Sequence, residues 1–342
     1  MPNPILTRAI EALASGRDLG ADETSEVLAE VMADRASETQ IAGFLIALRV
    51  KGETEEELAG LARTMRALAT PVRVARENLL DTAGTGGGRT TFNVSTTAAL
   101  IAAAAGCTVA KHGNRSATGL SGSADLLEAL GVRIDLSPAA VATCVEEVGF
   151  GFMFAPTHHA ATRFVVPVRR ALGVRTIFNF LGPLTNPAGA TCQLIGVSDA
   201  AFLERMAAAL ARLGARRALV VCSEDGLDEL STSGPTHVVE LSEGRLSRHV
   251  VHAGELGLDG ADPAEVAGGT PVENAATTRR ILAGERGAPR DLAALNAGAA
   301  IYAADGAASL EAGVRAAERA LDAGQGARLL DALALRTQEL AG

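Results

Sequence analysis

Four glycines within five positions, at residues 84 and 86–88, constrain the fold of this chain more than any other feature. They follow the apolar residues Leu79 and Leu80, which predicts a strand that ends in a loop whose backbone N–H groups no side chain covers. Asn93, Ser95 and Thr96 come next, and residues 97–105 are rich in helix formers. The stretch therefore predicts a helix N-terminus, with its free N–H groups and positive dipole end, beside the glycine loop.

A second polar stretch begins where a predicted strand over residues 108–110 ends. Its eleven positions contain a lysine, a histidine, an asparagine, an arginine and three hydroxyl side chains: Lys111, His112, Asn114, Arg115, Ser116, Thr118 and Ser121. Two strand ends, each followed by a polar loop and a helix, form a crevice typical of phosphate binding. Gly88 is followed by Arg89 and Thr90 and not by Lys-Ser/Thr, and residues 101–105 contain no acid, so neither the Walker nor the dinucleotide pattern fits. We predict a phosphate or pyrophosphate ligand.

Composition narrows the class of protein. The chain has 342 residues, 48% of them apolar and 3% aromatic, which suffices for two lobes with cores of Ala, Leu and Val. The net charge of −9 argues against nucleic acid as a partner. No run of 18 apolar residues and no basic-then-apolar start is present, so we expect neither a membrane span nor a signal peptide. Four widely separated cysteines indicate reduced thiols in a cytoplasmic protein.

The order of elements predicts an α/β protein. Residues 1–70 contain helical apolar spacing and two capping-box patterns, at Ser37 and Thr54, and form a small all-helical N-terminal lobe, joined by part of 160–190. Residues 40–48 are apolar on almost every face, so we expect them to be buried in the lobe or between subunits. Residues 75–342 form a larger lobe, with a mostly parallel central sheet flanked by helices and a helical C-terminal third.

Residues 156–186 combine two vicinal histidines with four arginines. His158 and His159 lack a third ligand at metal-binding spacing, so we do not predict a metal there. Arg169 follows Pro167 and Val168, and we expect it to be half-buried and fixed. A fixed guanidinium suits a planar carboxylate, which it can hold with two parallel hydrogen bonds.

Four carboxylates follow a predicted strand over residues 219–222, at Glu224, Asp225, Asp228 and Glu229. Such a cluster repels itself unless a cation is present, and Mg²⁺ is commonly held by one or two carboxylates together with substrate phosphates. An acidic surface loop is the alternative. The neighbouring phosphate-binding features favour magnesium.

Five separated motifs point to one family. In order they are GTGG…TFNVST, KHGNR, SGSADLLEALG, HH…VVPVRRALGVRTIFNFLGPLTNP and DGLDELS. With them the chain resembles anthranilate phosphoribosyltransferases from its N-terminal helices to about residue 305. The resemblance implies transfer of the phosphoribosyl group of 5-phosphoribosyl 1-diphosphate to the amine of anthranilate, giving N-(5-phosphoribosyl)anthranilate and pyrophosphate in tryptophan biosynthesis. It also implies a homodimer formed through the helical lobe.

The resemblance further implies roles for individual residues. Asp228 and Glu229 would hold magnesium, with Ser95 reaching the other of two ions per subunit. Anthranilate would lie against Gly84, Asn114, His159 and Arg169, with Arg169 on its carboxylate, and His112 or His159 could accept the released proton. The residues implied to bind the diphosphate substrate are Gly84, Gly86, Gly87, Gly88, Thr91, Asn93, Ser95, Thr96, Lys111, His112, Gly113, Asn114, Arg115, Ser116, Ala117, Thr118, Gly119 and Ser123.

Two departures from the family pattern and two rival interpretations remain. Gly88 stands where the family usually has Asp, in a loop one residue shorter, and Ala160 replaces the usual Pro after the paired histidines. A pyrimidine-nucleoside phosphorylase would have the same architecture without needing Asp228 and Glu229. A nucleic-acid-binding relative is the rival outside enzymes, and such a chain should be basic.

Overall fold

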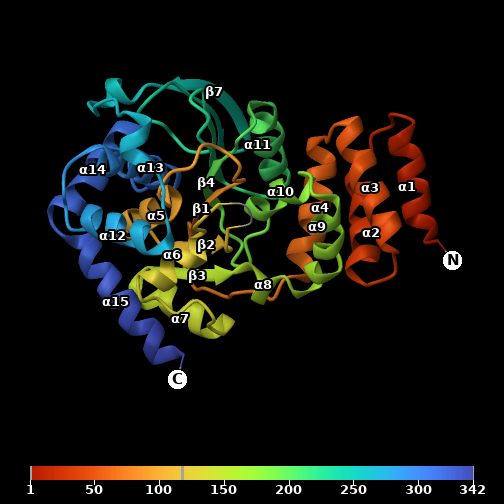
Figure 1. The fold of residues 1–342 in the computed structure, drawn as a ribbon, viewed down its shortest axis with the longest axis horizontal. Helices are drawn as coiled ribbons and strands as arrows, with labels where there is room; N and C mark the ends of the chain where they lie inside the picture. The colour runs from red at the N-terminus through yellow and green to blue at the C-terminus, as the bar shows by residue number, and fades with distance from the viewer. Residues whose placement is uncertain (1, 117–118, 342) are drawn as a thin grey trace.

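A seven-stranded sheet organises the larger part of the molecule (Figure 1). The structure is a computed structural model and describes residues 2–116 and 119–341. The strand order is β3-β2-β1-β4-β5-β6-β7, with parallel pairing from β3 to β5 and antiparallel pairing of β6 and β7. The strands are β1 (Leu80–Gly84), β2 (Val109–Gly113), β3 (Phe150–Phe154), β4 (Cys192–Gly196), β5 (Arg217–Ser223), β6 (Thr236–Ser242) and β7 (Arg245–Val251). The prediction of a mostly parallel sheet is confirmed.

Helices cover both faces of this sheet. On one face α5 and α13 are almost wholly buried, and their many alanines let the helices approach closely. The helices on this side are α5 (Val94–Ala104), α6 (Ser123–Ala129), α7 (Pro138–Val148), α12 (Pro271–Leu282), α13 (Ala288–Ala303), α14 (Leu310–Asp322) and α15 (Gln325–Leu340). Within the described part of the chain, no helix is both long enough and apolar enough to cross a membrane.

The N-terminal helices form a bundle at the opposite end of the molecule from α12–α15 (Figure 1). They are α1 (Pro4–Ala14), α2 (Ala21–Met32), α3 (Glu38–Lys51) and α4 (Glu55–Leu68). α8 (Ala155–His158), α9 (Val166–Leu172), α10 (Phe178–Leu181) and α11 (Leu203–Arg212) lie between this bundle and the sheet. Short 3₁₀ helices are η1 (Ala160–Phe164), η2 (Gly182–Leu184), η3 (Ala200–Phe202), η4 (Ala253–Leu256) and η5 (Pro263–Val266).

The sheet separates two hydrophobic cores. On β5, Leu219 and Val221 belong to the core shared with α5 and α13, whereas Ala218 and Val220 belong to the core shared with the bundle. This is the alternation expected of a strand whose two faces are both covered. The helical bundle therefore packs through α11 against one face of the sheet.

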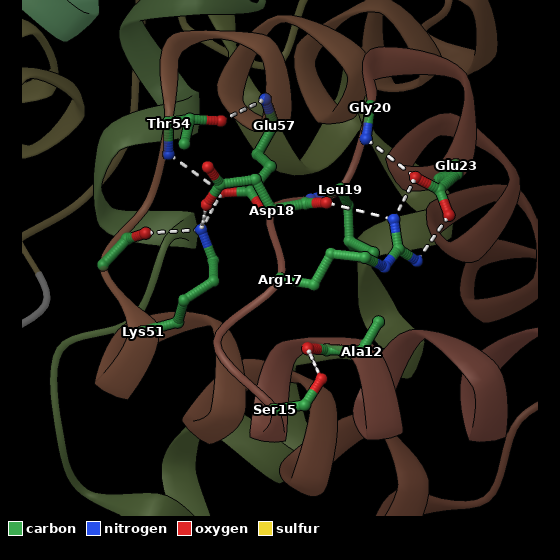
Figure 2. Close-up of polar contacts among 11 residues, drawn as sticks. Ala12, Ser15, Arg17, Asp18, Leu19, Gly20, Glu23, Lys51, Thr54 and Glu57 are labelled. Carbon is green, nitrogen blue, oxygen red and sulfur yellow. Dashed lines mark hydrogen bonds and ion pairs between the residues drawn. The ribbon is translucent and has the colours of Figure 1, made fainter.

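A buried carboxylate fixes the bundle's connections (Figure 2). Glu57 accepts hydrogen bonds from the backbone N–H groups of Leu19 and Thr54, at 2.9 and 2.8 Å. Its other partner is the ammonium of Lys51, 2.9 Å away, which also contacts Asp18 at 2.6 Å. The α1–α2 connection and the α3–α4 turn are thereby held to one side chain.

Two local expectations differ from the structure, and a third, the burial of residues 40–48 in the lobe or between subunits, is met in part within the lobe. β2 continues to Gly113, so Lys111 and His112 lie inside a strand and not in the loop after it, because pairing with β3 extends over these residues. β4, β6 and β7 were not predicted. In residues 40–48, Ile41, Phe44, Leu45 and Leu48 are buried as expected, but Ile46 and Ala47 are only partly covered.

Two glycines in the bundle should respond oppositely to alanine. A Cβ at Gly60 would lie 2.1 Å from Thr24 Oγ1 and 2.2 Å from the Ala21 carbonyl, so Gly60→Ala must push α2 and α4 apart. We expect it to lower the free energy of unfolding by about 1–3 kcal/mol. Gly43→Ala meets only Ile10, with Cδ1 at 3.4 Å and Cγ1 at 4.0 Å, and should raise the free energy of unfolding by roughly 0.5–1 kcal/mol. Urea unfolding of both variants measures the difference, and equal effects would contradict the packing described.

Candidate active site

The site lies where parallel strands end side by side. Gly84, the last residue of β1, pairs with Gly196, the last residue of β4, and β5 runs beside β4 into residues 224–229. Parallel neighbours bring their carboxyl ends to one edge, which is where α/β sheets bind ligands. The glycine loop and the acidic loop predicted from the sequence therefore meet.

Asp228 makes the closest of these contacts. Its Oδ2 accepts a hydrogen bond from Gly86 N at 2.8 Å. A Cβ at Gly84 would lie 2.7 Å from that carboxylate, and one at Gly88 would lie 2.8 Å from both Asp228 N and Oδ1. A Cβ at Gly196 would lie 1.6 Å from the Asp228 carbonyl oxygen. These glycines therefore leave room for the loop around Asp228 to approach closely, in addition to leaving N–H groups uncovered.

Glu229 is buried beside Asp228, with 9% of its surface exposed. Burial raises the pKa of the Glu229 carboxyl well above its usual value, and the charge of Asp228 raises it further. Burial also raises the pKa of Asp228. Lys111 and the Ser95 backbone favour the ionised form of Glu229 without offsetting these effects. Two adjacent carboxylates are thus held where a further positive charge would stabilise both.

Lys111 points into the protein. It is 1% exposed, its ammonium donates to the Thr82 carbonyl, and its Nζ lies 3.2 Å from Thr82 Oγ1. Burial lowers its pKa, while the charges of Asp81 and Glu229 act in the opposite direction. Asp81 accepts from His112 N at 3.0 Å and from Asn186 Nδ2 at 2.7 Å. The positive charge of Lys111 therefore favours the ionised forms of the buried carboxylates Asp81 and Glu229. The predicted position of Lys111 in a loop did not suggest this buried location.

Each of the three histidines near this region contacts a backbone carbonyl. His112 Nδ1 lies 3.2 Å from the Gly182 oxygen and His159 Nε2 lies 3.1 Å from the Thr185 oxygen, so these nitrogens carry the protons. The two rings are 5.1 Å apart. Burial lowers the pKa of His112 to about 3 and that of His159 to about 4, so both are neutral at pH 7. His158 contacts the Thr70 carbonyl at 2.8 Å.

The polar residues at the start of α5 are held by neighbours. Asn93 Nδ2 donates to the Ser121 carbonyl at 3.0 Å, and its Oδ1 accepts from Ser121 Oγ and Asn274 Nδ2, each at 2.9 Å. The Ser95 carbonyl accepts from Thr82 Oγ1 at 2.9 Å. Thr96 Oγ1 is buried without a partner among the described residues. This turn is therefore tied both to β1 and to the second loop.

In the second loop, Asn114 is exposed, whereas the Arg115 guanidinium pairs with Asp125 at 2.7 Å and Glu128 at 2.6 Å on α6. Ser116 Oγ accepts from Gly119 N at 2.7 Å, and Ser123 is the first residue of α6. Ala117 and Thr118 lie outside the described residues. Two further predicted residues occupy the edges of the region: Gly113 ends β2, and Thr91 forms an isolated bridge with Ala267.

Arg169 comes from a different part of the molecule. It lies on α9, which packs on α3 of the bundle, and it is partly buried. Its Cζ is 5.5 Å from the centroid of the Phe178 ring, and burial lowers its pKa. The expectation of a half-buried guanidinium agrees with this placement.

Comparison with known proteins identifies the family. The a/b domain of a glycosyl transferase family matches residues 76–327, and its helical bundle domain matches residues 7–69. Over 333 residues the chain is 52% identical to an anthranilate phosphoribosyltransferase from Roseiflexus castenholzii, covering 96% of this chain and 97% of the relative. The chain belongs to the anthranilate phosphoribosyltransferase family. The resemblance drawn from the five motifs is confirmed.

Solved structures of the family share the fold. The anthranilate phosphoribosyltransferase of Thermus thermophilus has a TM-score of 0.92 and 47% identity, covering 96% of this chain and 99% of that one. The Saccharomyces cerevisiae enzyme in complex with PRPP and Mg has a TM-score of 0.89 and 27% identity, covering 98% of each chain. The same yeast enzyme in complex with 4-fluoroanthranilate has a TM-score of 0.88.

The residues present fit a magnesium ion. Asp228 and Glu229 offer hard oxygen ligands, the kind that Mg²⁺ prefers, and their raised pKa values reflect burial without enough compensating positive charge. The sequence analysis missed two residues of this region: Asp81, whose charge acts on Lys111, and Gly196, which lies against the Asp228 carbonyl. A charged residue directly after Leu79 and Leu80 was a signal for Asp81. Nothing in the sequence alone marked Gly196.

Replacing Glu229 should stabilise the metal-free protein. Because the folded-state pKa of Glu229 is raised, the stability associated with its neutral form is complete below the unfolded pKa and is lost as the pH rises. Glu229→Gln removes this loss, so we expect Tm at pH 7 with a chelator to rise by about 2 °C or more. The gain should shrink toward pH 5. A lower Tm for the variant at pH 7 would show that the ionised carboxylate is stabilising.

Proposed function

We propose that the protein transfers the phosphoribosyl group of 5-phosphoribosyl 1-diphosphate to the amine of anthranilate and releases pyrophosphate, in tryptophan biosynthesis. The observation that carries this proposal is 52% identity to a protein of that name over 96% of this chain. The strand-end site, with its glycine loop beside two buried carboxylates, supports it. A pyrimidine-nucleoside phosphorylase would not need that carboxylate pair.

The reaction has two requirements. The ribose carbon becomes cationic as the pyrophosphate leaves, much as in glycoside cleavage, so the leaving group's negative charge must be stabilised and the amine must be aimed at that carbon. The glycine loop and the first turn of α5 supply N–H groups for the phosphates. Asn114, Ser116, Gly119 and Ser123 line the second loop beside them. In this proposal the buried charge of Lys111 favours the ionised form of Glu229, and Arg115 holds α6 through Asp125 and Glu128.

We propose Asp228 and Glu229 as the magnesium ligands, with Ser95 near the other of two ions per subunit. When bound, magnesium neutralises negative charge on the diphosphate. Gly86 N–H orients the Asp228 carboxylate through its 2.8 Å hydrogen bond. Lys111 lies close enough to Glu229 to favour its ionised form.

Anthranilate requires orientation more than activation. Its aromatic amine is neutral at pH 7, so no strong base is needed. We propose that Arg169 holds the carboxylate while Gly84, Asn114 and His159 surround the ring. His112 Nε2 is buried without a partner among the described residues and can accept a proton, but with a pKa of about 3 the imidazole is a weak base.

We also propose a division of the chain at residues 1–70, with part of 160–190, and 75–342. The bundle would form a homodimer interface, because α3 leaves Val50 82% exposed and Ile46 and Ala47 only partly covered. The four cysteines are free and buried, which is consistent with a reducing, cytoplasmic location.

Loss of anthranilate fluorescence on mixing with 5-phosphoribosyl 1-diphosphate and Mg²⁺ tests the function directly. We expect consumption that stops when a chelator is added and pyrophosphate formed in equal amount. A parallel assay offers a pyrimidine nucleoside and inorganic phosphate. Activity in that second assay alone would replace the proposal with the phosphorylase alternative.

Gly88→Ala should impair turnover without any change of charge. Its Cβ would lie 2.8 Å from Asp228 N, Asp228 Oδ1 and Gly226 O, so Asp228 must shift. Misplacing such a group typically lowers kcat on the order of 100-fold, and we expect a higher magnesium concentration at half-maximal rate. Gly254→Ala, which meets no atom within 4 Å, is the control. Superimposable magnesium titrations of Gly88→Ala and wild type would place residue 88 outside the metal's reach.

Arg169→Ala should raise KM for anthranilate and leave KM for the diphosphate substrate nearly unchanged. Losing a bidentate, charge-assisted contact should cost roughly 2–3 kcal/mol. Arg170→Ala removes an exposed arginine from the same helix and should change neither constant. If Arg169→Ala weakened both substrates equally, Arg169 would have a structural role.

A further inference from the structure

Arg175 reaches the glycine loop from the connection between α9 and α10. Its Nη2 donates to the Gly86 carbonyl at 3.2 Å and its Nη1 donates to Ser198 Oγ at 2.8 Å. Its Cζ lies 5.5 Å from the centroid of the Phe180 ring, so one face of the guanidinium is covered. None of the ion pairs among residues 2–116 and 119–341 involves this arginine, and its hydrogen-bond acceptors are neutral.

The backbone of Gly86 is held on both sides of its Cα. Its carbonyl accepts from Arg175 and from Ser198 Oγ, the latter at 3.0 Å, while its N–H donates to Asp228 at 2.8 Å. Ser198 N in turn donates to Thr85 Oγ1 at 3.2 Å. The Gly86 carbonyl belongs to the peptide unit after its Cα and the N–H to the unit before it, so Arg175 holds one unit and Asp228 contacts the other. Arg175 and the Asp228 carboxylate are therefore coupled through the backbone of a single residue.

The Arg175 side chain also restricts which residue can stand at position 87. A Cβ at Gly87 would lie 2.6 Å from Arg175 Nη1 and 3.2 Å from its Cζ. Gly87 also has a φ of +84°, which other residues rarely adopt. The guanidinium thus occupies the space beside the loop that a side chain at 87 would fill.

Arg175 also connects the loop to the helical bundle. Its backbone carbonyl accepts a hydrogen bond from Arg49 Nη1 on α3 at 2.6 Å. Arg49 is near the C-terminal end of α3, so a displacement of the bundle relative to the sheet would pull on the segment that carries Arg175. This contact is exposed, as is the hydrogen bond from Arg175 Nη2 to Gly86, whereas the one to Ser198 is partly buried.

We propose that Arg175 is a positioning residue for the transfer reaction: it holds the glycine loop and, through Gly86, the Asp228 carboxylate in the arrangement that receives the diphosphate substrate. This inference rests on the proposed function. It concerns the phosphate side of the site, whereas Arg169, six residues earlier, is assigned to anthranilate. Without the guanidinium, a loop of four glycines has many other conformations available, and binding must then select one of them.

Calorimetric binding of 5-phosphoribosyl 1-diphosphate with Mg²⁺ tests the proposal without turnover. We expect Arg175→Ala to weaken binding by about tenfold or more, in line with loss of charge-assisted hydrogen bonds. Arg175→Gln, which can still donate to the Gly86 carbonyl, should restore part of the affinity. In kinetics, KM for the diphosphate should rise while KM for anthranilate changes little.

A matched control uses the same pair of aromatic rings. Phe180 stacks on Phe202 with centroids 3.7 Å apart, and Arg205 lies over Phe202 at 5.3 Å. Arg205→Ala removes a comparable arginine–ring contact without touching the glycine loop and should bind the substrate as wild type does. Unfolding midpoints of all variants report any loss of folded protein.

Failure of the proposed function and failure of the role of Arg175 give different results. If wild-type protein does not bind the diphosphate substrate, the proposed function fails. If wild type and Arg175→Ala bind equally, the role of Arg175 is overturned while the function stands. Equal loss in Arg175→Gln and Arg175→Ala would also overturn positioning through the Gly86 carbonyl, because it would show that the positive charge, which also acts on Asp228, is what binding requires. Equal loss in Arg205→Ala would show a general effect of packing.

Discussion

The approach of Asp228 to the ends of β1 and β4 is the contact on which the site depends. A backbone carbonyl packed where the Cβ of residue 196 would stand, and a carboxylate packed where that of residue 84 would stand, require glycine at both positions. This contact draws the loop after β5 across the edge of the sheet and places its carboxylates beside the glycine loop. The N–H groups of the glycine loop and the carboxylate oxygens of the loop after β5 are therefore parts of one packed unit.

Beneath this unit lies a set of buried charges. Asp81, Lys111 and Glu229 are each less than a tenth exposed, and burial opposes the charged form of all three. The attraction between the ammonium and the two carboxylates offsets part of that cost, and hydrogen bonds from the His112 backbone and Asn186 offset more for Asp81. Glu229 is thus buried with too little nearby positive charge to offset its own charge. The burial that places Glu229 at the proposed metal site therefore also lowers the stability of the metal-free protein.

Local patterns in the sequence predict much of the fold and of the site. The N-cap at Ser37 before α3, the capping box at Thr54 before α4, the glycine loop and the acidic run after β5 each depend on a few neighbouring residues. The structure brings the glycine loop and the acidic run together because parallel strands end at one edge. What the sequence alone could not give depends on register between distant segments. Lys111 faces inward because β2 pairs with β3 as far as Gly113, and Gly196 matters because residue 228 crosses it. Arg175 belongs to no nucleotide-binding pattern, and its role depends on a loop 89 residues away.

Gly88 gives the short loop an evolutionary consequence. With Asp228 N, Asp228 Oδ1 and Gly226 O all 2.8 Å from where a Cβ would stand, this position accepts no side chain while the loop keeps its present length. One additional residue would let the chain arc away from Asp228 and make room for one. The length of this loop and the type of residue at position 88 therefore constrain each other. A lineage that gained a carboxylate here would first need the insertion, and a lineage that lost the insertion would be driven back to glycine.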